Sequence, residues 1–173
     1  MPGSGKSTVV SALKTKGFEA LNLGDGVRAE AKRRNLEPTG DNLGKLMLEL
    51  REKNGPGAIA ALLTEPIKSS QSKVIIIDGV RSIAEIEVLK NVGSVKLLSI
   101  EATADTRYKF LSSRGRSDDP TTREKFEERD NRELGVGIGE SIAVADETIS
   151  NSGITLDELT ELASKAIEKW IET

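Results

Sequence analysis

The residues Gly3–Thr8 read GSGKST, a combination that can bind phosphate. They match the last part of the phosphate-loop pattern GxxxxGK[ST], in which glycines let backbone N–H groups turn toward phosphate oxygens. In that pattern Lys6 reaches the β- and γ-phosphates, the Ser7 hydroxyl ligates Mg²⁺, and the following helix points its positive end at the anion. The alternative is a simple Gly/Ser turn. The expected nucleotide-binding residues are Gly3, Ser4, Gly5, Lys6, Ser7 and Thr8.

A second candidate is the carboxylate of Asp78, which ends the apolar run Val74–Ile77. An apolar strand that ends in an acid is typical of a Walker B element, which places a carboxylate beside the Mg²⁺ ion of a phosphate loop. We therefore predict Ser7 and Asp78 as metal ligands. The alternative is a strand that ends at an ordinary Asp-Gly turn.

The composition excludes several other kinds of site. The chain has no Cys and no His, which excludes disulfides, thiolate-bound metal sites and imidazole bases. Its 25 Lys and Arg against 28 Asp and Glu give a net charge of −3, which argues against nucleic acid as a partner. No segment approaches the roughly 20 apolar residues that span a bilayer, and the first residues do not form a signal peptide. We expect a cytoplasmic protein without a membrane partner.

The elements that must position these residues alternate between strands and helices. Four short apolar runs are typical of strands, two of them buried on both faces as in a parallel sheet. Helical spacing of apolar residues, with a capping box at Thr155–Glu158, favours helices between and after them. The expected fold is one α/β P-loop domain over 1–173, with a parallel sheet flanked by helices. The expected strands are Phe18–Leu23, Lys73–Asp78, Val95–Ala102 and Asp146–Asn151.

With the phosphate-loop sequence and Asp78 in this order, the chain resembles the nucleoside-monophosphate kinase branch of P-loop kinases, which includes adenylate kinase and dephospho-CoA kinase. It is most similar to an archaeal family described as adenylate kinase-related. Asp78–Arg81 resembles the DGxPR segment of adenylate kinases without its proline, and Gly24–Arg28 the segment that holds the acceptor. Arg114–Asp119 looks like a shortened lid, and Ala145–Asn151 is similar to the adenine-side loop of dephospho-CoA kinases. The resemblance implies that Asn151 contacts the nucleotide.

The arginines support this reading independently, because six of the eleven lie between Arg107 and Arg132. In-line phosphoryl transfer needs cations around the migrating group and little covalent help. We expect a short lid at 114–120 that closes over the phosphates, with Arg114, Arg116 and Arg129 as clamps. We assign Arg116 and Arg129, together with Lys6, to the catalytic group. The alternative is a solvated charged helix face, because acidic residues interleave with these arginines.

The resemblance also implies a second group of residues that binds the phosphate acceptor. Arg28 and Arg81 would bind the phosphate or terminal anionic group of the acceptor, because a guanidinium can form two hydrogen bonds to such a group. Asp25 could orient or deprotonate an acceptor hydroxyl, whereas a phosphate acceptor would need no base. The alternative role of Asp25 is a turn or a helix N-cap. A mostly helical insert at 24–68 is expected to select the acceptor.

The first strand of the resembled fold has no counterpart here, because the first Gly of the phosphate-loop pattern would precede Met1. In the resembled family that strand is central, between the strands that match Lys73–Asp78 and Val95–Ala102. We expect that the natural protein begins upstream with such a strand. For the chain as numbered, we expect a gap or a rearranged pairing in the sheet.

These patterns together predict an ATP- and Mg²⁺-dependent kinase. Its acceptor would be a small nucleotide-like molecule, either a nucleoside monophosphate or a compound of the dephospho-CoA type. The alternatives are a nucleotide-binding switch or assembly factor that hydrolyses ATP slowly, and an inactive P-loop protein. The sequence identifies neither the acceptor nor the oligomeric state.

Overall fold

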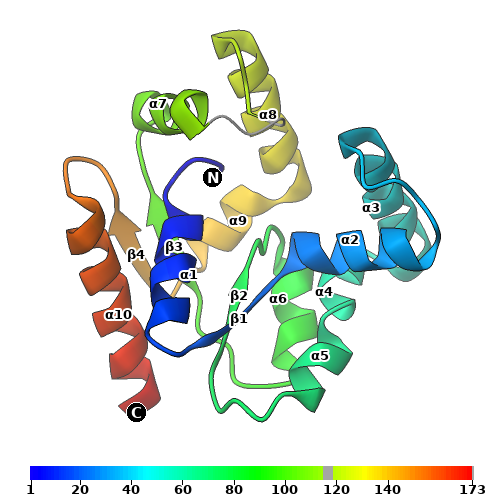
Figure 1. Cartoon of the computed structure of the whole chain (residues 1–173), viewed down its shortest axis with the longest axis horizontal. Coiled ribbons are helices and arrows are strands. Elements are labelled where there is room, and N and C mark those ends of the chain that lie inside the picture. Colours follow the sequence, from blue (N-terminus) through cyan, green and yellow to red (C-terminus); the bar gives the residue numbers. More distant parts are fainter. Residues whose placement is uncertain (115–118, 173) are drawn as a thin grey trace. The chain divides into compact units, whose positions relative to one another are not determined.

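A computed structural model describes residues 1–114 and 119–172 of the chain. The chain divides into two compact units, which we describe separately. The first contains residues 1–17 and 96–173, and the second contains residues 18–95. Figure 1 labels the helices and strands of both units.

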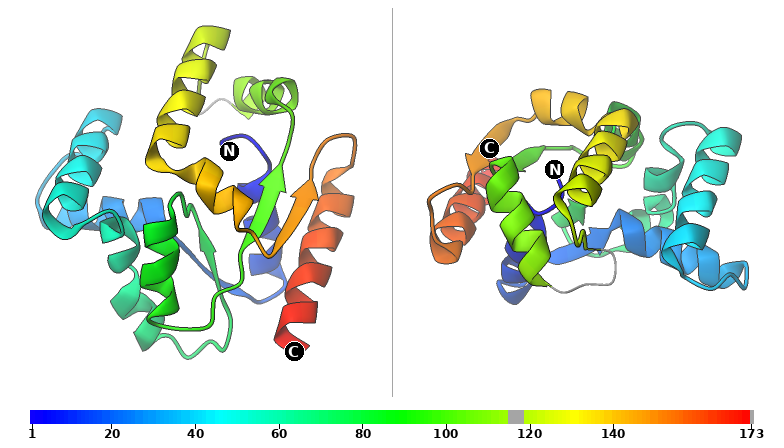
Figure 2. Two further views of the ribbon diagram at one scale, coloured as in Figure 1. Left: turned by 180° about the vertical axis from the view of Figure 1, so that it is seen from behind. Right: turned by 90° about the horizontal axis from the view of Figure 1, so that it is seen from above.

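The first unit contains the phosphate-loop sequence at its start. Its elements are α1 (Lys6–Thr15), β3 (Leu98–Glu101), α7 (Ala104–Arg114), α8 (Arg123–Val136), α9 (Ile138–Ala143), β4 (Glu147–Ser150) and α10 (Leu156–Glu172). Strands β3 and β4 pair in parallel, with Leu98 opposite Glu147 and Glu101 opposite Ser150. Helix α1 packs against α10, and Figure 2 shows α10 alongside β4.

Local signals explain how these elements begin. Helix α10 follows the predicted capping box, since Thr155 N donates to Glu158 Oε2 at 2.7 Å and Glu158 N donates to Thr155 Oγ1 at 3.3 Å. Asp146 aligns the start of β4 with β3, because its Oδ2 accepts from Leu97 N at 2.7 Å. That hydrogen bond is the main reason why the pKa of Asp146 lies below its ordinary value. The core of the unit includes Leu13, Leu111, Phe126 and Leu159, each at most 1% exposed.

The second unit has a helical layer over two strands. Its elements are β1 (Glu19–Asn22), α2 (Leu23–Arg33), α3 (Gly40–Asn54), α4 (Ala58–Ala61), α5 (Thr64–Ser69), β2 (Ile75–Asp78) and α6 (Ile83–Lys90). Strands β1 and β2 are parallel, with Glu19 opposite Ile75 and Asn22 opposite Asp78. Leu23, Val27 and Ala31 of α2 lie on one helix face and are buried with Leu46 and Leu50 of α3.

The mixed α/β class with parallel strands and flanking helices is confirmed. The described strands form two two-stranded sheets, β1–β2 in the second unit and β3–β4 in the first. Strand β2 is only half-buried, contrary to the expectation of burial on both faces. In the described chain it pairs with β1 alone. Within the mostly helical insert expected at 24–68, α4 and α5 are two separate short helices.

Candidate functional site

The phosphate-loop backbone in the first unit depends on two glycines. Gly3 has a φ of +78° and Gly5 a φ of +103°, a region that L side chains rarely adopt. A Cβ on Gly3 would lie 2.8 Å from Arg107 O, and one on Gly5 would lie 2.6 Å from Asn151 Nδ2. Both positions therefore require glycine for backbone conformation and for space. The space that a Cβ would fill, close to other chain segments, fits the tight loop that cradles a phosphate.

Helix α1 begins directly after the loop, with Gly5 as its N-cap. The Gly5 carbonyl accepts from Thr8 N at 3.0 Å and from Val9 N at 3.2 Å. Within the described residues, the N–H groups of Gly3, Ser4 and Gly5 donate to no protein acceptor. Together with the first turn of α1, these donors form an electropositive group of the kind that can bind a phosphate.

Lys6 lies over the loop that precedes it. Its Nζ donates to Met1 O at 2.7 Å and to Ser4 Oγ at 3.2 Å. The ammonium group is therefore held beside the loop backbone, and its contact with the β- and γ-phosphates stays a prediction. Ser7 is exposed in the first turn of α1, so its hydroxyl is accessible to a ligand. Ligation of Mg²⁺ by Ser7 stays a prediction.

Two buried polar side chains, those of Asn151 and Arg107, donate hydrogen bonds to backbone carbonyls of the phosphate loop and the residues before it. The Asn151 side-chain amide, in a residue that is 5% exposed, donates to Ser4 O at 3.0 Å. Asn151 N donates to Glu101 O at 2.7 Å, so the residue is fixed at the ends of β3 and β4. The Arg107 guanidinium donates to Pro2 O at 3.1 Å and forms a bidentate pair with Asp130 of α8. The structure thus gives Asn151, which we predicted to contact nucleotide, a role in positioning the loop.

Two of the predicted lid arginines, Arg114 and Arg129, lie beside one carboxylate, that of Asp119. Arg114, the last residue of α7, pairs with Asp119 through Nε at 3.1 Å and also through Nη2. Arg129 Nη1 of α8 lies 3.9 Å from Asp119 Oδ1, and Asp119 is 5% exposed. Arg116 and most of the predicted lid 114–120 lie outside the described residues. Asp119 therefore braces Arg114 and Arg129, and clamping of phosphates by these arginines stays a prediction.

The predicted acceptor residues of the second unit lie where β1 and β2 end. Asp25 and Arg28, one turn apart on α2, form an ion pair of 2.6 Å with side chains 73% and 58% exposed. Asp78 Oδ2 accepts from Asn22 Nδ2 at 3.0 Å, and Asn22 Oδ1 accepts from Gly24 N at 2.8 Å. Asn22, which sequence reasoning missed, caps α2 and fixes Asp78.

The loop after β2 presents Arg81, and a buried carboxylate supports it. Arg81 N donates to Glu85 Oε2 at 2.8 Å, and Arg51 Nη2 lies 3.3 Å from Glu85 Oε1. Neither Arg51 nor Glu85 was a candidate from the sequence. The signal for Glu85 is the spacing Ser82-x-x-Glu85, which is that of a capping box.

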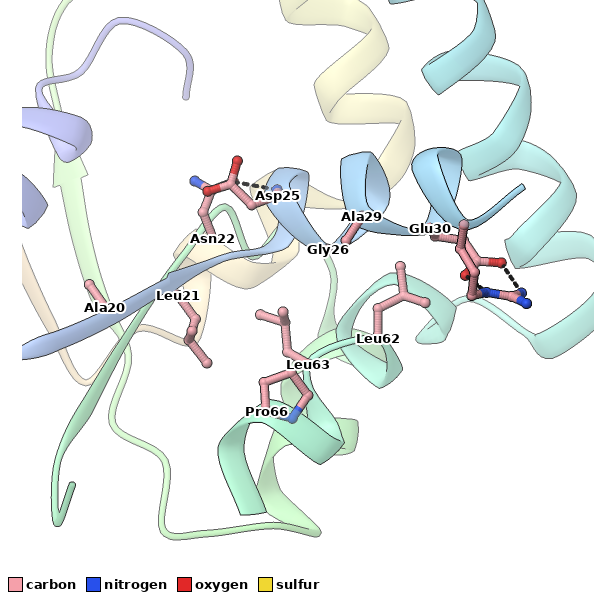
Figure 3. A pocket seen from close by; sticks show the side chains of 11 residues that line it. Ala20, Leu21, Asn22, Asp25, Gly26, Ala29, Glu30, Leu62, Leu63 and Pro66 are labelled. Carbon is pink, nitrogen blue, oxygen red and sulfur yellow. Dashed lines mark hydrogen bonds and ion pairs between the residues drawn. The ribbon is translucent and has the colours of Figure 1, made fainter. Parts of the chain in front are cut away.

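A pocket of about 370 Å³ also lies in the second unit, between α2, β1 and the turn from α4 to α5. Figure 3 shows Asn22 and Asp25 at one end, Glu30 at the other, and apolar side chains such as Leu62 between them. Hydrogen bonds from Arg33 and Arg34 lower the pKa of Glu30 to about 2. Of the predicted acceptor residues, Asp25 lines this pocket, whereas Arg28 and Arg81 do not.

In the part of the chain that the structure describes, no helix has the length and apolar character needed to cross a membrane. No cluster of three or more acidic side chains forms a preformed metal site among the same residues. An Mg²⁺ ion here would instead arrive with the phosphates of a nucleotide and take one or two protein ligands, which is its usual mode of binding.

Comparisons with known proteins find a matching family model and similar relatives. A family model described as an AAA domain matches residues 1–127. The UPF0200 protein of Hyperthermus butylicus is 38% identical over 169 residues, covering 98% of this chain and 90% of that protein. The UPF0200 protein of Methanothrix thermoacetophila is 42% identical over 173 residues, covering 98% and 93%.

The fold has a counterpart among solved structures as well. The crystal structure of TT1252 from Thermus thermophilus superposes with a TM-score of 0.67 at 20% identity, covering 97% of this chain and 92% of that one. At this identity the likeness concerns the fold alone. The matching family model and the phosphate-loop sequence support a P-loop domain of the kinase-like type. The chain belongs to the UPF0200 family.

Proposed function

We propose that the protein is an ATP- and Mg²⁺-dependent kinase that phosphorylates a small nucleotide-like acceptor. The observation that carries the proposal is the phosphate loop, in which two glycines with positive φ and the Lys6 ammonium surround a group of backbone donors. We assign ATP to this loop in the first unit and the acceptor to Asp25, Arg28 and Arg81 in the second. We also propose a cytoplasmic location.

On the nucleotide side, each residue has a specific electrostatic role. Backbone N–H groups of the loop bind phosphate oxygens, and Lys6 offsets the charge that develops on the transferred group. Mg²⁺, with Ser7 and Asp78 as proposed ligands, would neutralise charge on the β- and γ-phosphates. Arg114 and Arg129 would exchange Asp119 for phosphate, because a guanidinium binds carboxylate and phosphate with the same geometry.

On the acceptor side, the proposed reaction is a direct in-line displacement. An acceptor oxygen forms a bond to the γ-phosphorus while the bond from that phosphorus to the β,γ-bridging oxygen breaks, and ADP leaves. If the accepting oxygen belongs to a hydroxyl group, its proton passes to the Asp25 carboxylate. If it belongs to a phosphate group, no proton transfer is needed. Arg28 and Arg81 would bind an anionic group of the acceptor.

The test is a panel of candidate acceptors incubated with ATP labelled on the γ-phosphate and with Mg²⁺. The panel contains nucleoside monophosphates and dephospho-CoA, and products are identified by mass. The proposal predicts one phosphorylated compound and an equal amount of ADP. Formation of ADP and free phosphate at the same rate with every compound would instead indicate a nucleotide switch with slow hydrolysis.

A further inference from the structure

The turn that carries Arg81 is built as a capping structure at the start of α6. Gly79 has a φ of +97°, which turns the chain sharply after Asp78. Ser82 is the N-cap of α6, and its Oγ accepts from Glu85 N at 3.3 Å. The spacing of Ser82 and Glu85 is that of a capping box, in which the glutamate returns a hydrogen bond to the N-cap backbone.

Glu85 departs from an ordinary capping box in two ways. Its Oε2 accepts at 2.8 Å from the backbone N–H of Arg81, the residue before the N-cap. Its side chain is 1% exposed, whereas Glu158 in the capping box of α10 is exposed. Burial of a carboxylate is costly unless it is paired and hydrogen-bonded, so stabilising a helix end does not by itself account for a buried glutamate here.

The partner of the buried carboxylate comes from a different helix. Arg51 lies near the end of α3, its side chain is 20% exposed, and its Nη2 lies 3.3 Å from Glu85 Oε1. A single carboxylate therefore connects α3, the start of α6 and the backbone of Arg81. All three belong to the second unit, in which the helical region expected to select the acceptor also lies.

We propose that Glu85 and Arg51 are positioning residues that fix the backbone of Arg81, so that its guanidinium is held ready for the anionic group of the acceptor. This inference rests on the proposed function for the role of Arg81. The two residues act through Arg81 and do not themselves touch the acceptor. Because the carboxylate binds both the Arg81 backbone and α3, a change in either partner should loosen the same loop.

The experiment compares Glu85→Gln and Arg51→Met with Arg81→Ala, using the compound that the acceptor panel identifies. Each of the three variants should raise the acceptor KM by about tenfold or more, the range expected from loss of a charge-assisted hydrogen bond, and leave the ATP KM unchanged. Combining Glu85→Gln with Arg51→Met should add little to either change alone, because both remove the same interaction.

The matched control is Glu158→Gln, which removes the charge of a capping glutamate at an exposed position in the first unit. It should leave the acceptor KM unchanged. Hydrogen exchange of the Arg81 amide provides a readout that needs no substrate, and exchange should be faster in Glu85→Gln but not in Glu158→Gln. An acceptor KM that rises in Arg81→Ala but stays at the wild-type value in folded Glu85→Gln would overturn the inference.

Failure of the proposed function gives a different result. If no compound is phosphorylated, the kinase assignment fails, and the Arg81 amide alone decides the positioning role. Unchanged exchange at that amide in Glu85→Gln then overturns the inference, whereas faster exchange supports it. If the panel identifies an acceptor but Arg81→Ala leaves the KM of that acceptor unchanged, Arg81 does not bind the acceptor. The inference is then overturned.

Discussion

Replacement of Gly5 by alanine should damage the phosphate loop through two separable effects. The backbone has a φ of +103°, where an L residue costs about 1–2 kcal/mol. The added Cβ would also lie 2.6 Å from Asn151 Nδ2 and 3.0 Å from Leu159 Cδ2. Asn151 would have to move, and its bond to Ser4 O contributes about 0.5–1.5 kcal/mol. We expect Gly5→Ala to lower the free energy of unfolding by about 1.5–3.5 kcal/mol, the sum of the two effects.

The chain offers a matched control at the other end of the same helix. Gly17 has a φ of +93°, and a Cβ there would meet nothing within 4 Å. Gly17→Ala should therefore cause only the backbone cost, about 1–2 kcal/mol, and leave ATP binding unchanged. The Gly5→Ala, Asn151→Ala double variant should recover part of the lost stability, because the closest contact of the new Cβ is removed.

The assays are urea unfolding of each variant and titration of ATP by calorimetry. Gly5→Ala should weaken ATP binding at least about tenfold, because a shift of the loop backbone misaligns several phosphate donors at once. The reasoning is refuted if Gly5→Ala binds ATP as tightly as the wild type. It is also refuted if Gly17→Ala is destabilised as much as Gly5→Ala.

Three further predictions concern the arginine pairs. Arg28→Ala should raise the acceptor KM far more than the ATP KM in steady-state kinetics. An equal rise in both KM values would show that Arg28 does not belong to the acceptor side. Arg107→Met should cost about 3 kcal/mol in urea unfolding and weaken ATP binding, because it leaves Asp130 without its guanidinium and frees Pro2 O; unchanged ATP affinity would contradict this. The pKa of Glu30 is lowered from 4.5 to about 2, so its contribution to stability is present above pH 4.5 and is lost as the pH falls toward 2. The stability difference between the wild type and Glu30→Gln should shrink over that range, and a constant difference would show that the carboxylate does not titrate in this way.

The strands and the phosphate loop could be predicted because their signals are local. Two apolar runs and two shorter segments predicted β1 to β4 within a few residues, and the sequence GSGKST predicted the loop. The split between α4 and α5 could not be predicted, since Ala58–Lys68 has a continuous helical pattern with its Pro66 inside the first turn of α5. The pairing of strands depends on segments far apart in the chain, and sequence spacing does not encode it.

The supporting roles of residues around the candidate site were missed for the same reason. Asn151 reaches Ser4 across 147 positions of sequence, and Arg107 reaches Pro2 across 105. Glu85 and Asn22 are common types at helix starts, so their sequence signals predict caps and not contacts with Arg81 or Asp78. Residues that bind a ligand directly follow recognisable motifs, whereas those that hold them in place are recognisable only from burial and partners.

The most direct test of the central claim is the rate of γ-phosphoryl transfer from ATP to the compounds of the acceptor panel, measured for the wild type and for Lys6→Ala. The account predicts that one compound gains a phosphoryl group as ADP forms in equal amount. It also predicts that Lys6→Ala lowers this rate at least about 100-fold while remaining folded, because the ammonium offsets charge on the transferred group. Transfer by Lys6→Ala at the wild-type rate, or ATP turnover that no compound in the panel accelerates, would contradict the account.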